Sequence, residues 1–162
     1  MALGGSMKIR LIESKDYKKV ADMIAESVKN SAFAKFYPQK TIDEVIESLN
    51  EEGVKQRASW THFYVIEEAQ EIIACGAIGP YWNSETESSL FSIFVASKHQ
   101  GQGYGRKIVE VLEQDEFFTR ARRIEVPASM SAIPFYRKLG YQHKNGDLVF
   151  DDGHFALEKF NK

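Results

Sequence analysis

The sequence has little cysteine and no long apolar run. Its single cysteine, Cys75, excludes an internal disulfide and any metal site that needs several cysteines. The apolar stretches have the length of strands, far short of the ~20 residues that span a bilayer, and no charged-then-apolar leader precedes them. We therefore expect no membrane contact and a location in the reducing cytoplasm.

An excess of positive charge is also missing. The 21 lysines and arginines nearly balance 23 aspartates and glutamates, and the isoelectric point is about 6.1. Nucleic-acid binding requires a basic surface, so we expect no nucleic-acid partner. The four histidines are not spaced as metal ligands, and we expect no metal cofactor.

The length of 162 residues suits one domain with its own core. Residues 1–6 read Met-Ala-Leu-Gly-Gly-Ser before a second methionine, and we interpret them as a leftover of expression. The domain is thus predicted to comprise residues 7–162. The sequence leaves open whether it forms a homodimer.

Hydrophobic periodicity predicts an α/β fold with a mixed, mostly antiparallel sheet of about seven strands flanked by four helices. Apolar positions at helical spacing, glycine stops and the capping box at 41–44 indicate helices over 14–28, 41–49, 104–118 and 131–139. Alternation over 8–13, and strand-like segments between polar breaks or turns, indicate strands over 8–13, 61–67, 71–78, 88–95, 123–126, 141–143 and 147–159. The segment 33–39 is predicted to be irregular, and turns are expected at Asn145-Gly146 and Asp151-Asp152-Gly153.

The most informative segment is the turn Gln100-Gly101-Gln102-Gly103-Tyr104-Gly105-Arg106 between a strand and a helix. Unpaired N–H groups at a helix N-terminus bind anions, and glycine lets the backbone approach a pyrophosphate. A dinucleotide fingerprint would need glycine where Arg106 stands, and no Gly-Lys-Ser/Thr triplet completes a P-loop. A turn that merely connects strand to helix remains the structural alternative.

Two signatures resemble those of the GNAT acetyltransferases. Gln100-x-x-Gly103-x-Gly105 is similar to their acyl-CoA signature, and it follows a strand ending at Val95 and opens a long helix. Residues 132–141, with Ala132, Phe135-Tyr136, Gly140 and Tyr141, are similar to their second signature. The clear resemblance covers about residues 88–142. It implies the acyl-CoA N-acyltransferase fold, splayed where the fourth and fifth strands part around the coenzyme.

The resemblance also implies which residues bind acetyl-CoA. Backbone groups near the end of the fourth strand would hold the pantetheine and carbonyl, and the glycine turn would hold the pyrophosphate. Ser129 stands where many members have a coenzyme-binding asparagine. The implied coenzyme-binding residues are Phe94, Val95, Gln100, Gly101, Gln102, Gly103, Tyr104, Gly105, Arg106, Ser129 and Tyr136.

Three residues are candidates for the chemistry. Tyr136 matches the family tyrosine that reaches the coenzyme sulfur, and a tyrosine is protonated at neutral pH, so we predict it to be the general acid. Ser89 stands where several members carry a glutamate base. Glu87 lies two residues earlier, and strict alternation would place both on the side of Val95, where Glu87 could act through a water. Three alternatives remain open: that water alone deprotonates the amine, that Glu87 is only a solvated surface carboxylate, and that Tyr136 is only a core aromatic.

The predicted function is transfer of an acetyl group from acetyl-CoA to a primary amine of a small molecule or peptide. The acceptor is expected to contact the first two helices, the aromatic segment 33–37, the Tyr81-Trp82 turn and the C-terminal hairpin. Two alternatives stay open. One is an acyl-CoA-binding module without catalysis, and the other is a protein N-acetyltransferase that uses the acidic cluster Glu47, Glu51 and Glu52.

Overall fold

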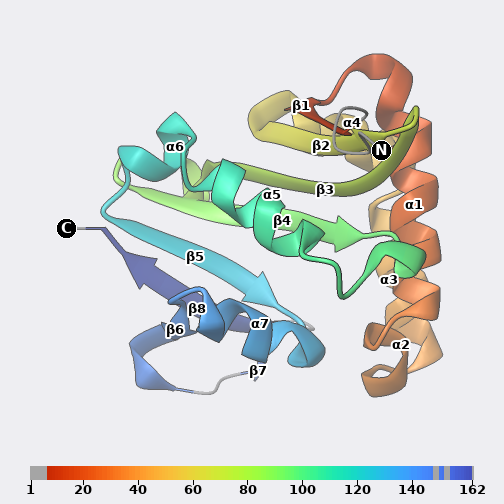
Figure 1. Cartoon of the computed structure of the whole chain (residues 1–162). Coiled ribbons are helices and arrows are strands. Elements are labelled where there is room, and N and C mark those ends of the chain that lie inside the picture. The colour runs from red at the N-terminus through yellow and green to blue at the C-terminus, as the bar shows by residue number, and fades with distance from the viewer. Residues whose placement is uncertain (1–6, 148–149, 152–153, 162) are drawn as a thin grey trace.

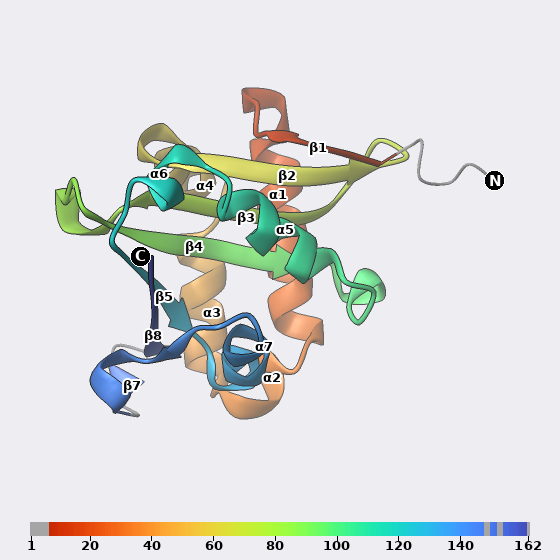
Figure 2. The same cartoon turned by 60° about the vertical axis from the view of Figure 1, so that its left-hand side comes forward.

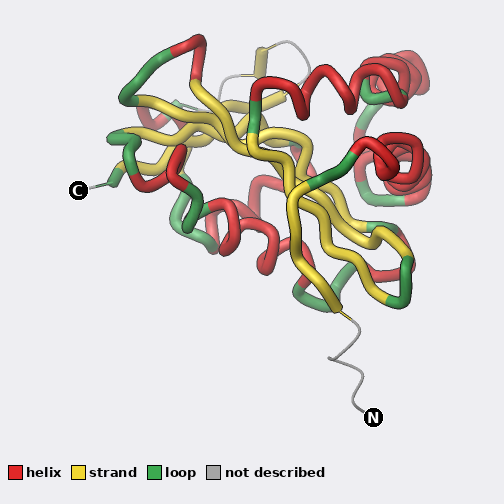
Figure 3. Tube along the Cα trace, turned by 90° about the horizontal axis from the view of Figure 1, so that it is seen from above, coloured by secondary structure: helices red, strands yellow, loops and turns green. Residues whose placement is uncertain are grey.

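The computed structural model describes residues 7–147, 150–151 and 154–161. Its strands form one mixed sheet in the order β1-β2-β3-β4-β5-β8-β6, and β7 pairs with β8. Every described pairing is antiparallel except that of β4 with β5. Helices cover both faces of the sheet (Figure 1, Figure 3). The predicted α/β fold with a mostly antiparallel sheet is confirmed.

The strands agree with the alternating segments of the sequence to within a few residues. They are β1 Met7–Leu11, β2 His62–Glu68, β3 Glu71–Pro80, β4 Glu87–Val95, β5 Arg123–Ala128, β6 Gln142–His143, β7 Phe150–Asp151 and β8 His154–Phe160. The long strand expected over 147–159 is described as β7 and β8, and the turn expected at Asp151-Asp152-Gly153 falls partly outside the described residues. Asn145 and Gly146 form the expected turn, each with a positive φ.

Seven α-helices are described where four were expected. They are α1 Tyr17–Asn30, α2 Phe33–Phe36, α3 Gln39–Ser48, α4 Glu51–Trp60, α5 Tyr104–Leu112, α6 Glu116–Thr119 and α7 Ile133–Lys138. The predicted helix over 104–118 is divided because the Asp115 side chain caps a new helix by accepting from the Phe117 N–H. The segment 33–39, predicted to be irregular, contains the single turn of α2.

Helix α4 was missed because its sequence carries almost no apolar stripe: within it, only Val54 is fully buried. Its start is nevertheless defined locally, since Asn50 Oδ1 accepts a 2.9 Å hydrogen bond from the Gly53 N–H. The capping box expected at Thr41 is wrong, because α3 begins two residues earlier and Pro38 is its N-cap residue. Gly140 ends α7 as predicted, with a φ of 97°.

Two hydrophobic cores lie on opposite faces of the sheet. On one face, which we call the α1 face, strand side chains such as Phe63, Val65 and Cys75 pack against α1, α3 and α4. On the other, the α5 face, Leu90 and other strand side chains pack against α5, α6 and α7. Burial on both faces explains why the central strand β3 is apolar over most of its length.

A β-bulge in β4 reverses which face its side chains occupy. Cys75 pairs with Phe94 and Ala77 with Phe91, so Ser92 and Ile93 together oppose the single residue Gly76. Ser92 has a φ of 55° at this point. As a result Phe91 and Phe94 both pack on the α1 face, whereas Ile93 and Val95 pack on the α5 face.

The bulge corrects one prediction. Strict alternation along β4 placed Glu87 and Ser89 on the same side as Val95. Alternation holds only up to Phe91, so Glu87 and Ser89 share the α1 face with Phe91, and Val95 lies on the opposite face. Strand β4 itself contains no proline or glycine that could have indicated the bulge.

Strands β4 and β5 pair over only three residues, Glu87–Ser89 with Arg123–Glu125, and then diverge (Figure 1). Pro127, which follows the end of the strand predicted over 123–126, lies within β5. Because β4 has already diverged there, no neighbouring strand on that side of β5 needs a hydrogen bond from an N–H at this position. In the described residues, no helix combines the length and the apolar composition needed to cross a membrane.

Candidate active site

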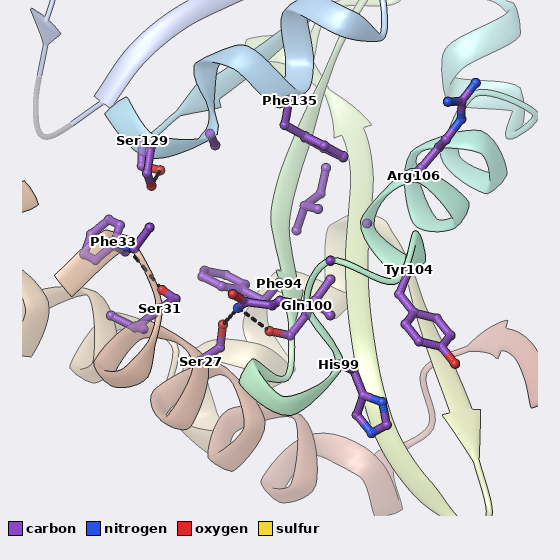
Figure 4. A pocket seen from close by; sticks show the side chains of 18 of the residues that line it. Ser27, Ser31, Phe33, Phe94, His99, Gln100, Tyr104, Arg106, Ser129 and Phe135 are labelled. Atoms are coloured by element: carbon purple, nitrogen blue, oxygen red, sulfur yellow. Dashed lines mark hydrogen bonds between the residues drawn. The ribbon is translucent and has the colours of Figure 1, made fainter. Parts of the chain in front are cut away.

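A cavity of about 450 Å³ lies where β4 and β5 diverge (Figure 4). It is lined by the C-terminal half of α1, the end of β4, the glycine turn before α5, and the loop and helix that follow β5. Sequence-predicted residues that line it are Phe94, Val95, Gln100, Gly101, Gly103, Tyr104, Gly105, Arg106, Ser129 and Tyr136. Gln102, also predicted, is exposed on the turn and is not among the lining residues.

The glycine turn has a backbone that other residues would strain. Gly101 and Gly103 have φ values of 78° and 90°, and a Cβ added at either would meet no atom within 4 Å. A Cβ on Gly105 would lie 3.2 Å from the Phe135 ring. Two glycines therefore keep the turn in a left-handed conformation beneath open space, and the third lets α5 approach α7.

The N-terminus of α5 faces this open space. Its N-cap residue is Gly103, which has no side chain to accept from the first N–H groups of the helix. Arg106 lines the cavity from the first turn, and its Nε donates to Glu110 at 3.3 Å. Unsatisfied N–H groups, the helix dipole and a nearby guanidinium make this end of the cavity suitable for a pyrophosphate.

Residues in the glycine turn and just before it contact α1 and β4. Gln100 Nε2 donates to the Val95 carbonyl at 3.0 Å and to Ser27 Oγ at 3.4 Å (Figure 4). The Glu26 carboxylate accepts from both the N–H, at 3.1 Å, and the hydroxyl of Ser97. The Gln100 side chain is thus hydrogen-bonded to α1 and β4, and these bonds hold the backbone of the glycine turn at the edge of the cavity.

Tyr136 reaches the cavity from α7 and is only 5% exposed. Its ring packs against Phe135 and Tyr141, with centroids 5.0 and 6.0 Å away. Burial raises the pKa of the phenol well above its usual value. The hydroxyl therefore keeps its proton at neutral pH, and no described residue forms a hydrogen bond with it.

Glu87 and Ser89 lie at the other end of β4 and do not line the cavity. Glu87 Oε1 accepts from Arg123 Nη1 at 3.2 Å, and the side chain is 38% exposed. Ser89 is 3% exposed, and its hydroxyl donates to the Leu90 carbonyl at 3.1 Å. Ser129 does line the cavity, with its Oγ 3.2 Å from that of Ser131.

One wall of the cavity carried no functional motif in the sequence. It consists of Ser27, Val28, Ser31, Ala32 and Phe33, from the end of α1, the connection to α2 and the first residue of α2. The small residues Ser27, in the last turns of α1, and Ser31, its C-cap residue four positions later, were the available signal. Helix α2 lies beside the loop before α7 (Figure 2), and Tyr37 Oη accepts from the Met130 N–H at 3.0 Å across that contact.

Cys75 has no access to this site. Its thiol is fully buried, donates to the Ser92 carbonyl at 3.2 Å, and burial raises its pKa to about 12. A thiol with that pKa stays protonated and unreactive at neutral pH. Within the described part of the chain, no group of histidine, cysteine, aspartate and glutamate side chains could hold a metal ion.

Several solved structures share this fold. The chain is similar to a PaiA N-acetyltransferase from Thermoplasma acidophilum in complex with coenzyme A, with 16% identity, a TM-score of 0.79, and 96% of this chain and 99% of that chain covered. A GCN5-related N-acetyltransferase from Rhodopseudomonas palustris matches at 17% identity and a TM-score of 0.77, with 96% of each chain covered. A GNAT-family acetyltransferase from Staphylococcus aureus Mu50 matches at 18% identity and a TM-score of 0.72, covering 96% and 99%. At such identities these matches establish the fold.

A family model goes further than the fold. Residues 59–143 match the model described as an acetyltransferase (GNAT) domain, which is more than half of the chain. The matched region contains the bulged strand β4, the glycine turn and Tyr136, and it supplies most of the residues that line the cavity. The chain belongs to the GNAT acetyltransferase family.

Proposed function

We propose that the protein is an acetyl-CoA-dependent N-acetyltransferase of the cytoplasm that transfers the acetyl group directly to a primary amine of a small molecule or peptide. The observation that carries this proposal is one cavity that contains both an anion-binding helix N-terminus and a protonated tyrosine. Membership of the acetyltransferase family supports it.

The residues present fit the proposed coenzyme. N–H groups from Gln100 to Gly105 would hold the pyrophosphate over the open turn, and Arg106 would add positive charge. The end of β4, around Phe94 and Val95, would contact the pantetheine, because β5 has diverged and leaves this edge of β4 unpaired. Acetyl-CoA itself supplies the reactive thioester.

Attack of a neutral amine on the thioester carbonyl forms the C–N bond and breaks the C–S bond. The departing sulfur needs a proton, and the Tyr136 hydroxyl is the group we assign to supply it. Burial holds that proton on the phenol at neutral pH, so Tyr136 is suited to be an acid and not a base. It is then reprotonated from solvent.

The amine must lose a proton before or during attack. Glu87, acting through water, and Ser89 remain the side chains predicted for this step, and both lie on the α1 face together with Phe94, which lines the cavity. However, Glu87 is paired with Arg123, and neither Glu87 nor Ser89 lines the cavity. These two facts favour direct loss of the amine proton to water.

The proposed function is tested by calorimetric titration with acetyl-CoA, followed by a thiol-release assay with a panel of small amines and peptides with free amino groups. Micromolar binding with thiol release by an amine is the expected result. Binding without release by any amine would favour the acyl-CoA-binding module, and release only by peptides would favour protein acetylation. Absence of binding would overturn the proposal.

We expect Gly103→Ala to weaken acetyl-CoA binding at least about tenfold, because a left-handed alanine costs ~1–2 kcal/mol and its methyl group would occupy the open space over the turn. Gly146→Ala is the matched control, since Gly146 also has a positive φ, of 75°, with nothing within 4 Å of an added Cβ. Gly146 is remote from the cavity, so this variant should share the loss of stability but keep its affinity. Equal affinities for the two variants would show that the turn is only a connection.

A further inference from the structure

Arg57 differs from the other arginines of the chain. Of the seven, only Arg10, Arg57 and Arg123 are shielded from solvent to any large extent. Arg10 pairs with Asp16 and Glu67, and Arg123 pairs with three glutamates. Among residues 7–147, 150–151 and 154–161, no carboxylate pairs with Arg57. A shielded cation without a counter-ion is costly, and it indicates a role beyond packing.

Two aromatic rings hold the guanidinium of Arg57. Its Cζ lies 4.4 Å from the centroid of Phe91 and 5.4 Å from that of Trp60, and the two rings meet edge to face. These contacts fix the plane of the guanidinium and leave its edges for hydrogen bonds. Its only described polar contact is weak, a distance of 3.5 Å from Nη1 to Ser92 Oγ. Burial lowers the pKa of Arg57, which reflects the missing counter-charge.

Arg57 lies on the α1 face of the sheet, beside the bulge of β4, and is not itself among the residues that line the cavity. Ser92 is the bulge residue, and the residue after it, Ile93, lines the cavity. Phe91, which holds Arg57, and Phe94, which lines the cavity, lie on the same face because of the bulge. The cavity itself is lined from both faces of the sheet, by Phe33 and by Tyr136 among others.

We propose that Arg57 binds a carboxylate of the acceptor, so that the acceptor is an amine that also carries a carboxylate, as an amino acid does. This inference rests on the proposed acetyltransferase function and specifies its substrate class. The planar guanidinium presents paired N–H donors that match a carboxylate, and the rings of Phe91 and Trp60 orient them in advance. A purely cationic acceptor would instead be repelled at this place.

The test uses α- and ω-amino acids, each paired with its own primary amide, which keeps the amine and removes the carboxylate. We expect the wild-type protein to prefer at least one amino acid over its amide by about 10- to 100-fold in kcat/KM, the range of a charged hydrogen-bonded pair. In Arg57→Met that ratio should fall toward one, mainly through KM, and Arg57→Lys should retain part of it.

Arg120→Met is the matched control, because the guanidinium of Arg120 also lies over a ring, 4.7 Å from the centroid of Phe117, but on an exposed position outside the cavity. It should keep the wild-type ratio. Provided that acetyl-CoA still binds, three results would each overturn the inference. The wild-type protein would use acid and amide equally, it would acetylate no amino acid, or Arg57→Met would keep the wild-type acid-to-amide ratio. Failure to bind acetyl-CoA would overturn the proposed function itself.

A binding measurement separates this role from packing. Trp82, which is 85% exposed, is replaced by phenylalanine so that Trp60 is the only tryptophan reporting fluorescence. Titration of the coenzyme A complex with the preferred amino acid should change Trp60 emission, and its amide should not. Loss of the response in Arg57→Met with an unchanged melting temperature supports the inference, whereas the same response to acid and amide contradicts it.

Discussion

Tyr136→Phe is expected to lower kcat by about 100-fold or more while acetyl-CoA binding changes little, because general acid catalysis typically contributes 10²–10⁴-fold. The substitution removes only the hydroxyl and keeps the ring that packs against Phe135 and Tyr141. Steady-state kinetics with thiol detection gives kcat, and calorimetry gives the affinity. Because burial raises the pKa of Tyr136, the wild-type rate should show no loss from its ionisation below about pH 10.

Tyr141→Phe is the control for this prediction. Tyr141 is fully buried, its hydroxyl donates to Glu113 Oε2 at 2.8 Å, and the residue does not line the cavity. Its loss should cost about 1–3 kcal/mol of stability and leave kcat close to wild type. Equal losses of coenzyme affinity and turnover in Tyr136→Phe would indicate a packing role for Tyr136.

Arg123→Met is expected to lower the free energy of unfolding by about 3–5 kcal/mol at pH 7, the usual effect of removing one partner from a buried ionic cluster. Arg123 is 8% exposed and joins three strands where the sheet is still closed. Its Nε donates to Glu158 Oε1 at 2.7 Å, its Nη2 to Glu125, and its Nη1 to Glu87 at 3.2 Å. Without it, the one described cation that remains beside these three carboxylates is Lys144, whose Nζ lies 3.0 Å from Glu125.

The effect should depend on pH in a defined direction. Burial by itself would raise the pKa of Glu158, but hydrogen bonds from the Asn145 N–H and Arg123 outweigh it and hold the pKa below its usual value. A carboxyl with a lowered pKa stabilises the fold above its unfolded pKa, and that contribution is lost as the pH falls through the folded pKa. Urea unfolding should therefore show the largest difference between wild type and Arg123→Met near neutral pH and a smaller one below about pH 4.

Arg122→Met controls for the loss of a positive charge at the neighbouring position. Its side chain is exposed, so the expected change is within about 0.5 kcal/mol. A loss below 1 kcal/mol in Arg123→Met, similar to that of the control, would show that the cluster does not hold β5 to β4 and β8.

Much of the molecule followed from local sequence. Strand-length apolar or alternating segments gave β2, β3 and β4, and Gly140 ended α7, because side-chain pattern and φ preference depend on neighbouring residues alone. The glycine turn was predictable for the same reason, since Gly101 and Gly103 adopt φ values that other residues avoid. Helix α4 was not, because a helix with only Val54 fully buried has almost no apolar stripe.

The sequence by itself thus determined the order of the strands and of the longest helices, the glycine turn and the family signatures, all of which depend on residues close together in the chain. Only the tertiary structure decided which side chains share the cavity. The bulge at Ser92 arises from how β4 pairs with β3, and it moves Glu87 to the α1 face. Likewise, the packing of α4 against β4 brings Arg57 to Phe91 and Ser92 and, among the described residues, to no carboxylate, so the role proposed for it depends on contacts between segments far apart in the sequence.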